Sequence, residues 1–86
     1  MNQNPRVTGL RALVKKFMLE RATNLSGPQA LEIWRVMQLL ETNGSLAGLP
    51  GAVLQMAVDF NPFPEASEII HEKALVYERN FDTRQR

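Results

Sequence analysis

The sequence contains no cysteine and only one histidine, His71, among its 86 residues. Without cysteine the chain cannot form a disulfide bond or a thiolate zinc site, and one histidine cannot supply a multi-histidine metal site. We therefore expect no bound metal and no cofactor. A domain this short has a thin stability margin, and the supplement left to it is association with a second subunit.

Long uninterrupted hydrophobic runs are also missing. The first nine residues are mostly polar, and basic residues interrupt the apolar positions that follow, so no segment resembles a signal peptide. The longest weakly polar stretch, residues 46–58, contains a proline and a glutamine and is shorter than the roughly 20 residues that span a membrane. These features, together with the lack of cysteine, predict a soluble cytoplasmic protein with no membrane partner.

Recognisable catalytic and phosphate-binding motifs are absent as well. His71 and Glu72 could begin a zinc-protease motif, but the residue one helical turn after the histidine is Leu75 and not a second histidine. No serine lies in a nucleophile-elbow motif, and no glycine-rich segment ends in lysine followed by serine or threonine. We therefore expect a protein that is not an enzyme, in which His71 is a partly exposed residue at a helix edge.

The residues that are present describe a folded chain. A content of 44% hydrophobic and 22% charged residues is typical of globular proteins and differs from that of disordered segments. Because 86 residues cannot enclose two separate cores, residues 1–86 should form a single domain. We expect its two ends, residues 1–7 and 83–86, to be flexible.

Local patterns in the first half of the chain predict two helices. From Leu10 onward, apolar residues recur at the i, i+3, i+4, i+7 spacing of one helical face, which predicts a helix that Thr8 caps and that ends near residue 24. Ser26, with Gln29 three residues later, forms a capping-box pattern and predicts a second helix over residues 27–42. Gly44 is the expected left-handed residue at its end.

Prolines organise the second half. Pro50 and Pro64 can each open a helix, which predicts helices over residues 50–60 and from residue 64 to about residue 82. Between them, Pro62 and Pro64 disfavour helical geometry in the residues that precede them. No alternation typical of a strand interrupts this pattern, so the sequence predicts an all-α, compact bundle of four helices joined by short loops.

The excess of apolar residues predicts a binding surface. The predicted helices 27–42 and 50–60 are apolar around most of their circumference, whereas a four-helix monomer covers only part of two such helices. We therefore expect a homodimer that forms through one of these two helices, and a non-enzymatic protein that acts by binding another protein, as a regulator or adaptor. The predicted partner or dimer surface consists of Leu19, Trp34, Val53, Leu54, Met56, Val58 and Leu75.

The charges are distributed unevenly. Residues 1–22 carry five basic side chains against one acidic side chain, a net charge of +4, whereas residues 23–80 carry three basic against seven acidic, a net charge of −4. A basic first helix can complement the acidic remainder of the bundle or contact nucleic acid. The helix 50–60 offers only Gln55 and Asp59 to base edges, so a nucleic-acid-binding regulator, our alternative, would use the first helix. Its candidate contacts are Arg6, Arg11, Lys15 and Lys16.

Overall fold

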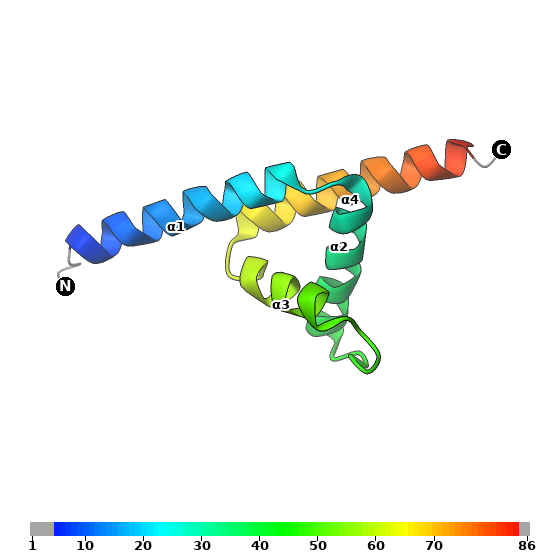
Figure 1. Ribbon diagram of the computed structural model, residues 1–86, viewed down its shortest axis with the longest axis horizontal. Helices are drawn as coiled ribbons and strands as arrows, with labels where there is room; N and C mark the ends of the chain where they lie inside the picture. The colour runs from blue at the N-terminus through cyan, green and yellow to red at the C-terminus, as the bar shows by residue number, and fades with distance from the viewer. Residues whose placement is uncertain (1–4, 85–86) are drawn as a thin grey trace.

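The computed structural model describes residues 5–84 and contains four α-helices and no strand within that range (Figure 1). The predicted all-α bundle of four helices with short connections is confirmed. The helices are α1 (Pro5–Asn24), α2 (Gly27–Thr42), α3 (Gly51–Phe60) and α4 (Pro64–Arg84). Of the ends expected to be flexible, residues 1–4 and 85–86 lie outside the described residues, whereas residues 5–7 and 83–84 belong to helices α1 and α4.

The start of α1 differs from the prediction. Thr8 lies inside the helix and does not cap it, because the helix already begins at Pro5. Proline suits the first helical position, since its missing N–H group would have no partner there and its fixed φ angle matches the helical backbone. The apolar spacing predicted the helix but could not locate this first turn, because the residues before Leu10 are mostly polar.

The bounds of α2 agree with the prediction, and the capping box at its start is confirmed. The Ser26 hydroxyl accepts a hydrogen bond from the Gln29 backbone N–H at 3.3 Å, and the Gln29 side chain accepts one from the Ser26 backbone N–H at 3.0 Å. The prediction that Gly44 is the left-handed residue is wrong, because Asn43 has that conformation, with φ 55°. Asparagine tolerates it through its short polar side chain, and the Gly44 N–H then donates to the carbonyl of Leu39 at 2.9 Å.

Substituting Ser26 tests the strength of this cap. Ser26→Ala leaves the Gln29 N–H group without its partner, so we expect the free energy of unfolding to fall by about 1 kcal/mol in a urea titration. Ser45→Ala is the matched control, because the Ser45 hydroxyl accepts only a long 3.4 Å bond from Ala47 in a loop. Equal losses in the two variants would contradict the role given to the cap.

The end of α3 also departs in detail from the prediction. Asn61 keeps helical dihedral angles, φ −53° and ψ −39°, although it precedes Pro62. The helix ends here because Pro62 has no N–H group with which to continue the hydrogen-bond ladder, and not because the residue before it leaves the helical region. At the other end, Pro50 occupies the N-cap position without a side-chain hydrogen bond, and Gly51 is the first residue of α3.

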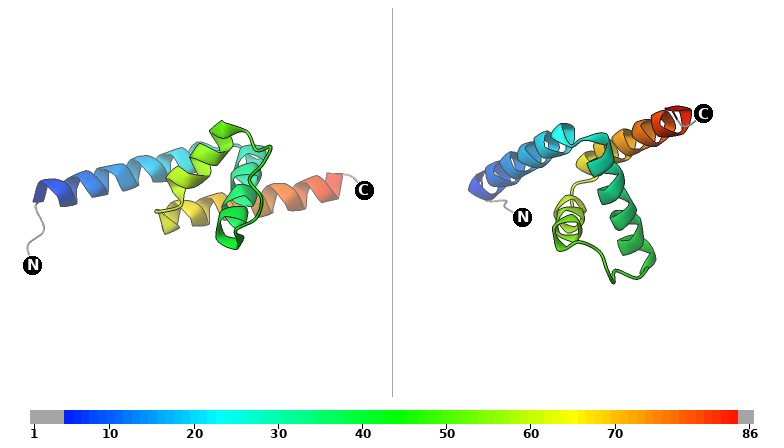
Figure 2. Two further views of the ribbon diagram at one scale, coloured as in Figure 1. Left: turned by 90° about the horizontal axis from the view of Figure 1, so that it is seen from below. Right: turned by 45° about the vertical axis from the view of Figure 1, so that its right-hand side comes forward.

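Helices α1 and α4 run in the same direction and are staggered along their length (Figures 1 and 2). The end of α1 packs beside the start of α4, so the N-terminal part of α1 extends beyond the bundle at one end and the C-terminal part of α4 at the other. The longest dimension is therefore 56 Å, against 27 and 20 Å for the other two. Helices α2 and α3 lie on one side of this staggered pair, and α2 makes the most extensive contact with α4.

The hydrophobic core lies where the four helices meet. Its largest fully buried side chains are Phe60, Ile33, Ile70 and Val36. Among the side chains of α1 that the structure describes, residues 8–17 lie outside this core, and the helix contributes to it from Met18 onward.

Candidate protein-binding surface

Exposed apolar side chains gather on the two helices that extend from the bundle. Among the residues whose side chains are described, four large hydrophobic residues are exposed on α1, three on α4, one on α3 and none on α2. They are Leu10, Leu13, Val14, Phe17, Val58, Leu75, Val76 and Phe81. The apolar surface exposed to solvent is therefore concentrated on α1 and α4.

Four of these residues form one line on α1, which we call the α1 stripe: Leu10, Leu13, Val14 and Phe17. Their exposed fractions are 61%, 63%, 41% and 58%, and their spacing places them on one helical face. Met18, the next residue, is only 6% exposed. At about 100° of rotation per residue, the stripe lies roughly 100° around the helix from the face that packs on α4. Helix α1 thus has two apolar faces, of which one is covered.

The covered face of α1 also carries an ionic contact to α4. Lys15 pairs with Glu65, near the start of α4, and both side chains remain about half exposed. Met18 and Ala22 are buried in the core on the same side. Met18, Ala22 and the Lys15–Glu65 pair thus mark the face of α1 that turns toward the bundle, and the α1 stripe faces solvent.

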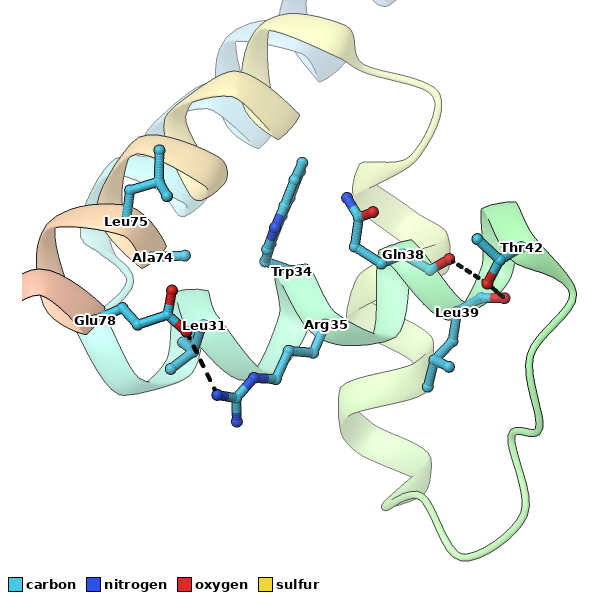
Figure 3. A pocket seen from close by; sticks show the side chains of 9 residues that line it. All are labelled: Leu31, Trp34, Arg35, Gln38, Leu39, Thr42, Ala74, Leu75 and Glu78. Atoms are coloured by element: carbon cyan, nitrogen blue, oxygen red, sulfur yellow. Dashed lines mark hydrogen bonds and ion pairs between the residues drawn. The ribbon is translucent and has the colours of Figure 1, made fainter.

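A groove lies between α2 and α4, near the part of α4 that extends from the bundle (Figure 3). Its volume is about 470 Å³ and most of its lining is apolar. Arg35 and Glu78 form an ion pair of 3.6 Å across it. The residues that line this α2/α4 groove are Leu31, Trp34, Arg35, Gln38, Leu39 and Thr42 from α2, and Ala74, Leu75 and Glu78 from α4.

Trp34 stands between the two helices that form the groove (Figure 3). Its ring stacks on that of His71 from α4, with centroids 4.1 Å apart and an angle of 10° between the planes. Both residues are half-buried, which agrees with the expected place of His71 at a helix edge. The stack holds one face of α2 against α4 and gives the groove a rigid aromatic wall.

The seven residues predicted as a partner surface are not brought together by the fold. Val58 and Leu75 are exposed, whereas the other five are half-buried and pack against the core. Helices α2 and α3 cover one another, and α4 covers a further face of α2, so less of their apolar surface faces solvent than their composition suggested. Trp34 and Leu75 meet in the α2/α4 groove. Self-association through α2 or α3 stays a prediction.

Sequence reasoning missed the exposure of the α1 stripe, whose spacing is also that of a core face. A signal was present in the sequence, since α1 carries a second apolar line through Met18 and Ala22 on the neighbouring face. Two apolar lines on one terminal helix exceed what a single packing contact covers. That excess could have identified α1 as the helix with apolar surface that the bundle does not cover.

The basic residues of α1 are divided among different faces. Arg11 and Lys16 are exposed, Lys15 is paired with Glu65, and the side chain of Arg6 lies outside the described residues. Helical spacing places Arg11 and Lys16 on opposite sides of the α1 stripe. In the described part of the chain, no three acidic or histidine side chains come together as a metal site, and no helix is long and apolar enough to cross a membrane.

Comparisons with protein-family models, with curated proteins and with solved structures found no match to this chain. Function is therefore inferred from the α1 stripe and the α2/α4 groove.

Proposed function

We propose that this chain is a non-enzymatic protein that acts by binding proteins, as a regulator or adaptor, and that it works as a homodimer. The observation that supports this is the α1 stripe, four neighbouring apolar side chains left exposed on a helix whose other apolar face is already packed. On the order of 400 Å² of apolar surface gathered in one place matches the largest patch of a typical soluble monomer, and such patches are often functional. The i, i+3, i+4, i+7 spacing is the one by which a helix docks into a groove.

The polar surroundings of the α1 stripe suit the same role. Arg11 and Lys16 flank it, so an apolar centre is bordered by charged residues, as in many protein interfaces. Nucleic-acid binding by α1 has weaker support, because Arg11 and Lys16 lie on different sides of the helix and Lys15 is paired with Glu65. The apolar stripe between Arg11 and Lys16 does not match the continuous negative charge of a phosphate backbone.

Capture from a lysate of the native host tests the proposal. Tagged wild-type chain should retain its partner proteins, including untagged copies of itself, and the double variant Leu13→Asp/Phe17→Asp should lose them. Two carboxylates placed in an apolar contact without partners would each cost a few kcal/mol. Because both positions are exposed in the single chain, the fold should survive the change, as circular dichroism can verify.

The matched control carries the same added charge at two other exposed positions, Ala47→Asp and Ala52→Asp. It should capture the same proteins as the wild-type chain. If the α1 double variant also keeps them all, the proposed binding surface is wrong.

A further inference from the structure

We propose that the α1 stripe binds the α2/α4 groove of a second copy of this chain, so that two copies form a reciprocal two-fold dimer. This inference rests on the proposed function and names the surface that each copy offers the other. In this dimer α2 is still part of the interface, as the sequence predicted, and it contacts α1 of the other copy. Four observations support it: the shape of the molecule, the dimensions of the two surfaces, the charges, and the exposed area.

The shape of the molecule favours a reciprocal contact. The α1 stripe lies at one end of the 56 Å long dimension, and the free part of α4 lies at the other (Figures 1 and 2). A two-fold axis perpendicular to that dimension places the α1 end of one copy beside the α4 end of the other. The same rotation creates the identical contact at the opposite end. Each copy then uses both of its exposed surfaces at once.

The dimensions of the stripe and the groove are similar. From Leu10 to Phe17 the α1 stripe is seven residues long, which is roughly 10 Å of helix. A second hollow, lined by Leu31, Arg35, Tyr77, Glu78 and Phe81, adjoins the groove at the Arg35–Glu78 pair. From Ala74 to Phe81 the α4 wall of the two hollows is also seven residues long. Leu75 and Phe81 lie about 120° apart around α4, so a helix that docks between them would contact one of them along each of its edges.

The charges select the groove over a second α1 stripe. Pairing α1 with α1 would bring together the Arg11 and Lys16 side chains that flank the two stripes, and like charges at close range disfavour an interface. The groove instead belongs to residues 23–80, which carry three basic and seven acidic side chains, a net charge of −4. A basic helix that docks there is attracted by the body of the other copy.

The exposed apolar area is close to what a stable dimer uses. The α1 stripe with Leu75 and Phe81 exposes on the order of 600 Å² in each copy, against about 800 Å² of total surface per partner in a standard interface. The polar margins of the groove, including the Arg35–Glu78 pair, would supply the remainder. A reciprocal dimer therefore buries the exposed apolar residues of α1 and two of the three on α4.

Site-directed cross-linking tests this arrangement. Because the sequence has no cysteine, a maleimide would react with thiols only at the introduced positions. One chain carries Leu13→Cys, the other carries Leu75→Cys, and the two are mixed and treated with a short bifunctional maleimide. The mixture should give cross-linked heterodimers, whereas Leu13→Cys alone should give none, since the two stripes lie at opposite ends of the dimer. The matched control is a mixture of the Leu13→Cys chain with a chain that carries Ala52→Cys on α3. This mixture should not cross-link. Efficient cross-linking of Leu13→Cys with itself would overturn the proposal.

Sedimentation equilibrium at micromolar concentration supplies an independent readout. The wild-type chain should show the mass of a dimer, and Leu13→Asp or Leu75→Asp should each weaken association by about a hundredfold or more. Mixing these two variants should restore part of the dimer, because the intact stripe of one meets the intact groove of the other. If stripe pairs with stripe, the Leu75→Asp variant should instead stay dimeric by itself. A clean monomer mass for the wild-type chain overturns the proposal.

The two experiments separate this inference from the proposed function. If the wild-type chain is a monomer while capture of other proteins still requires the α1 stripe, the second copy is the wrong occupant and the protein-binding function stands. If capture does not depend on the stripe either, both proposals fall.

Discussion

Replacing Phe60 by alanine should lower the free energy of unfolding by about 3 to 5 kcal/mol, the usual cost of removing a buried aromatic side chain. Phe60 is the largest fully buried residue and is the last residue of α3. It belongs to a core cluster to which all four helices contribute, so its removal weakens the packing that joins them. Because small domains have about 5 to 15 kcal/mol in total, this single change can unfold a large share of the molecules.

The surroundings of Phe60 explain why the cavity would not simply close. Its ring is fully buried, and the Arg21 guanidinium carbon of α1 lies 5.4 Å from the ring centroid. Alanine would leave that cation without the aromatic face, which adds about 0.5 to 1 kcal/mol to the loss. The helices that line the site are held by other contacts, such as the Lys15–Glu65 pair, and relax only in part.

Urea unfolding followed by circular dichroism measures the loss, and Phe17→Ala is the matched control. Phe17 is the same residue type on the α1 stripe, 58% exposed, so its loss should change stability by less than about 1 kcal/mol in the single chain. Both variants should be compared at concentrations low enough to keep the chain monomeric, since association would stabilise the wild type. Equal losses for Phe60 and Phe17 would show that α3 is packed differently.

The parts of the fold that depend on neighbouring residues could be predicted from the sequence. Ser26 and Gln29 determine the start of α2 through hydrogen bonds that span three residues, and Pro64 determines the start of α4. The choice between Asn43 and Gly44 as the left-handed residue could not be predicted, because both tolerate that conformation. The largest such error is at the start of α1, which begins at Pro5 and not after Thr8.

The candidate site could be predicted only in part, because exposure depends on how the helices are arranged. Met18 is buried and its neighbour Phe17 is not, because the two lie about 100° apart around α1 and only the face of Met18 turns toward the bundle. Similarly, Leu54 is half-buried while Val58, one turn later, is exposed, since only part of α3 faces α2 and α4. The apolar excess itself was evident in the composition, but its location on α1 required the tertiary structure.

A close approach between α2 and α4 leaves no room for a side chain at Gly27. A Cβ atom built at Gly27 would lie 2.8 Å from Cδ1 of Tyr77 and 2.9 Å from its Cβ and Cγ, closer than real Cβ contacts. The tyrosine ring can turn, but its Cβ atom is attached to the backbone of α4, so relief of the clash requires the two helices to move apart. Overpacking of this kind costs about 1 to 3 kcal/mol.

Gly27→Ala should therefore destabilise the fold although alanine is the better helix former, and Gly51→Ala should do the opposite. Gly51 opens α3, and a Cβ atom there meets nothing within 4 Å, so the lower entropy of the unfolded chain should raise stability by up to about 1 kcal/mol. The two glycine substitutions are matched in chemistry and in their place at the start of a helix, and they differ in the presence of Tyr77. Thermal unfolding of both variants gives the sign of each change in stability directly.

Because α2 and α4 form the walls of the α2/α4 groove, a shift of these helices in Gly27→Ala should also change the fluorescence of Trp34. If both variants were stabilised, α2 and α4 would have to lie further apart than the structure shows.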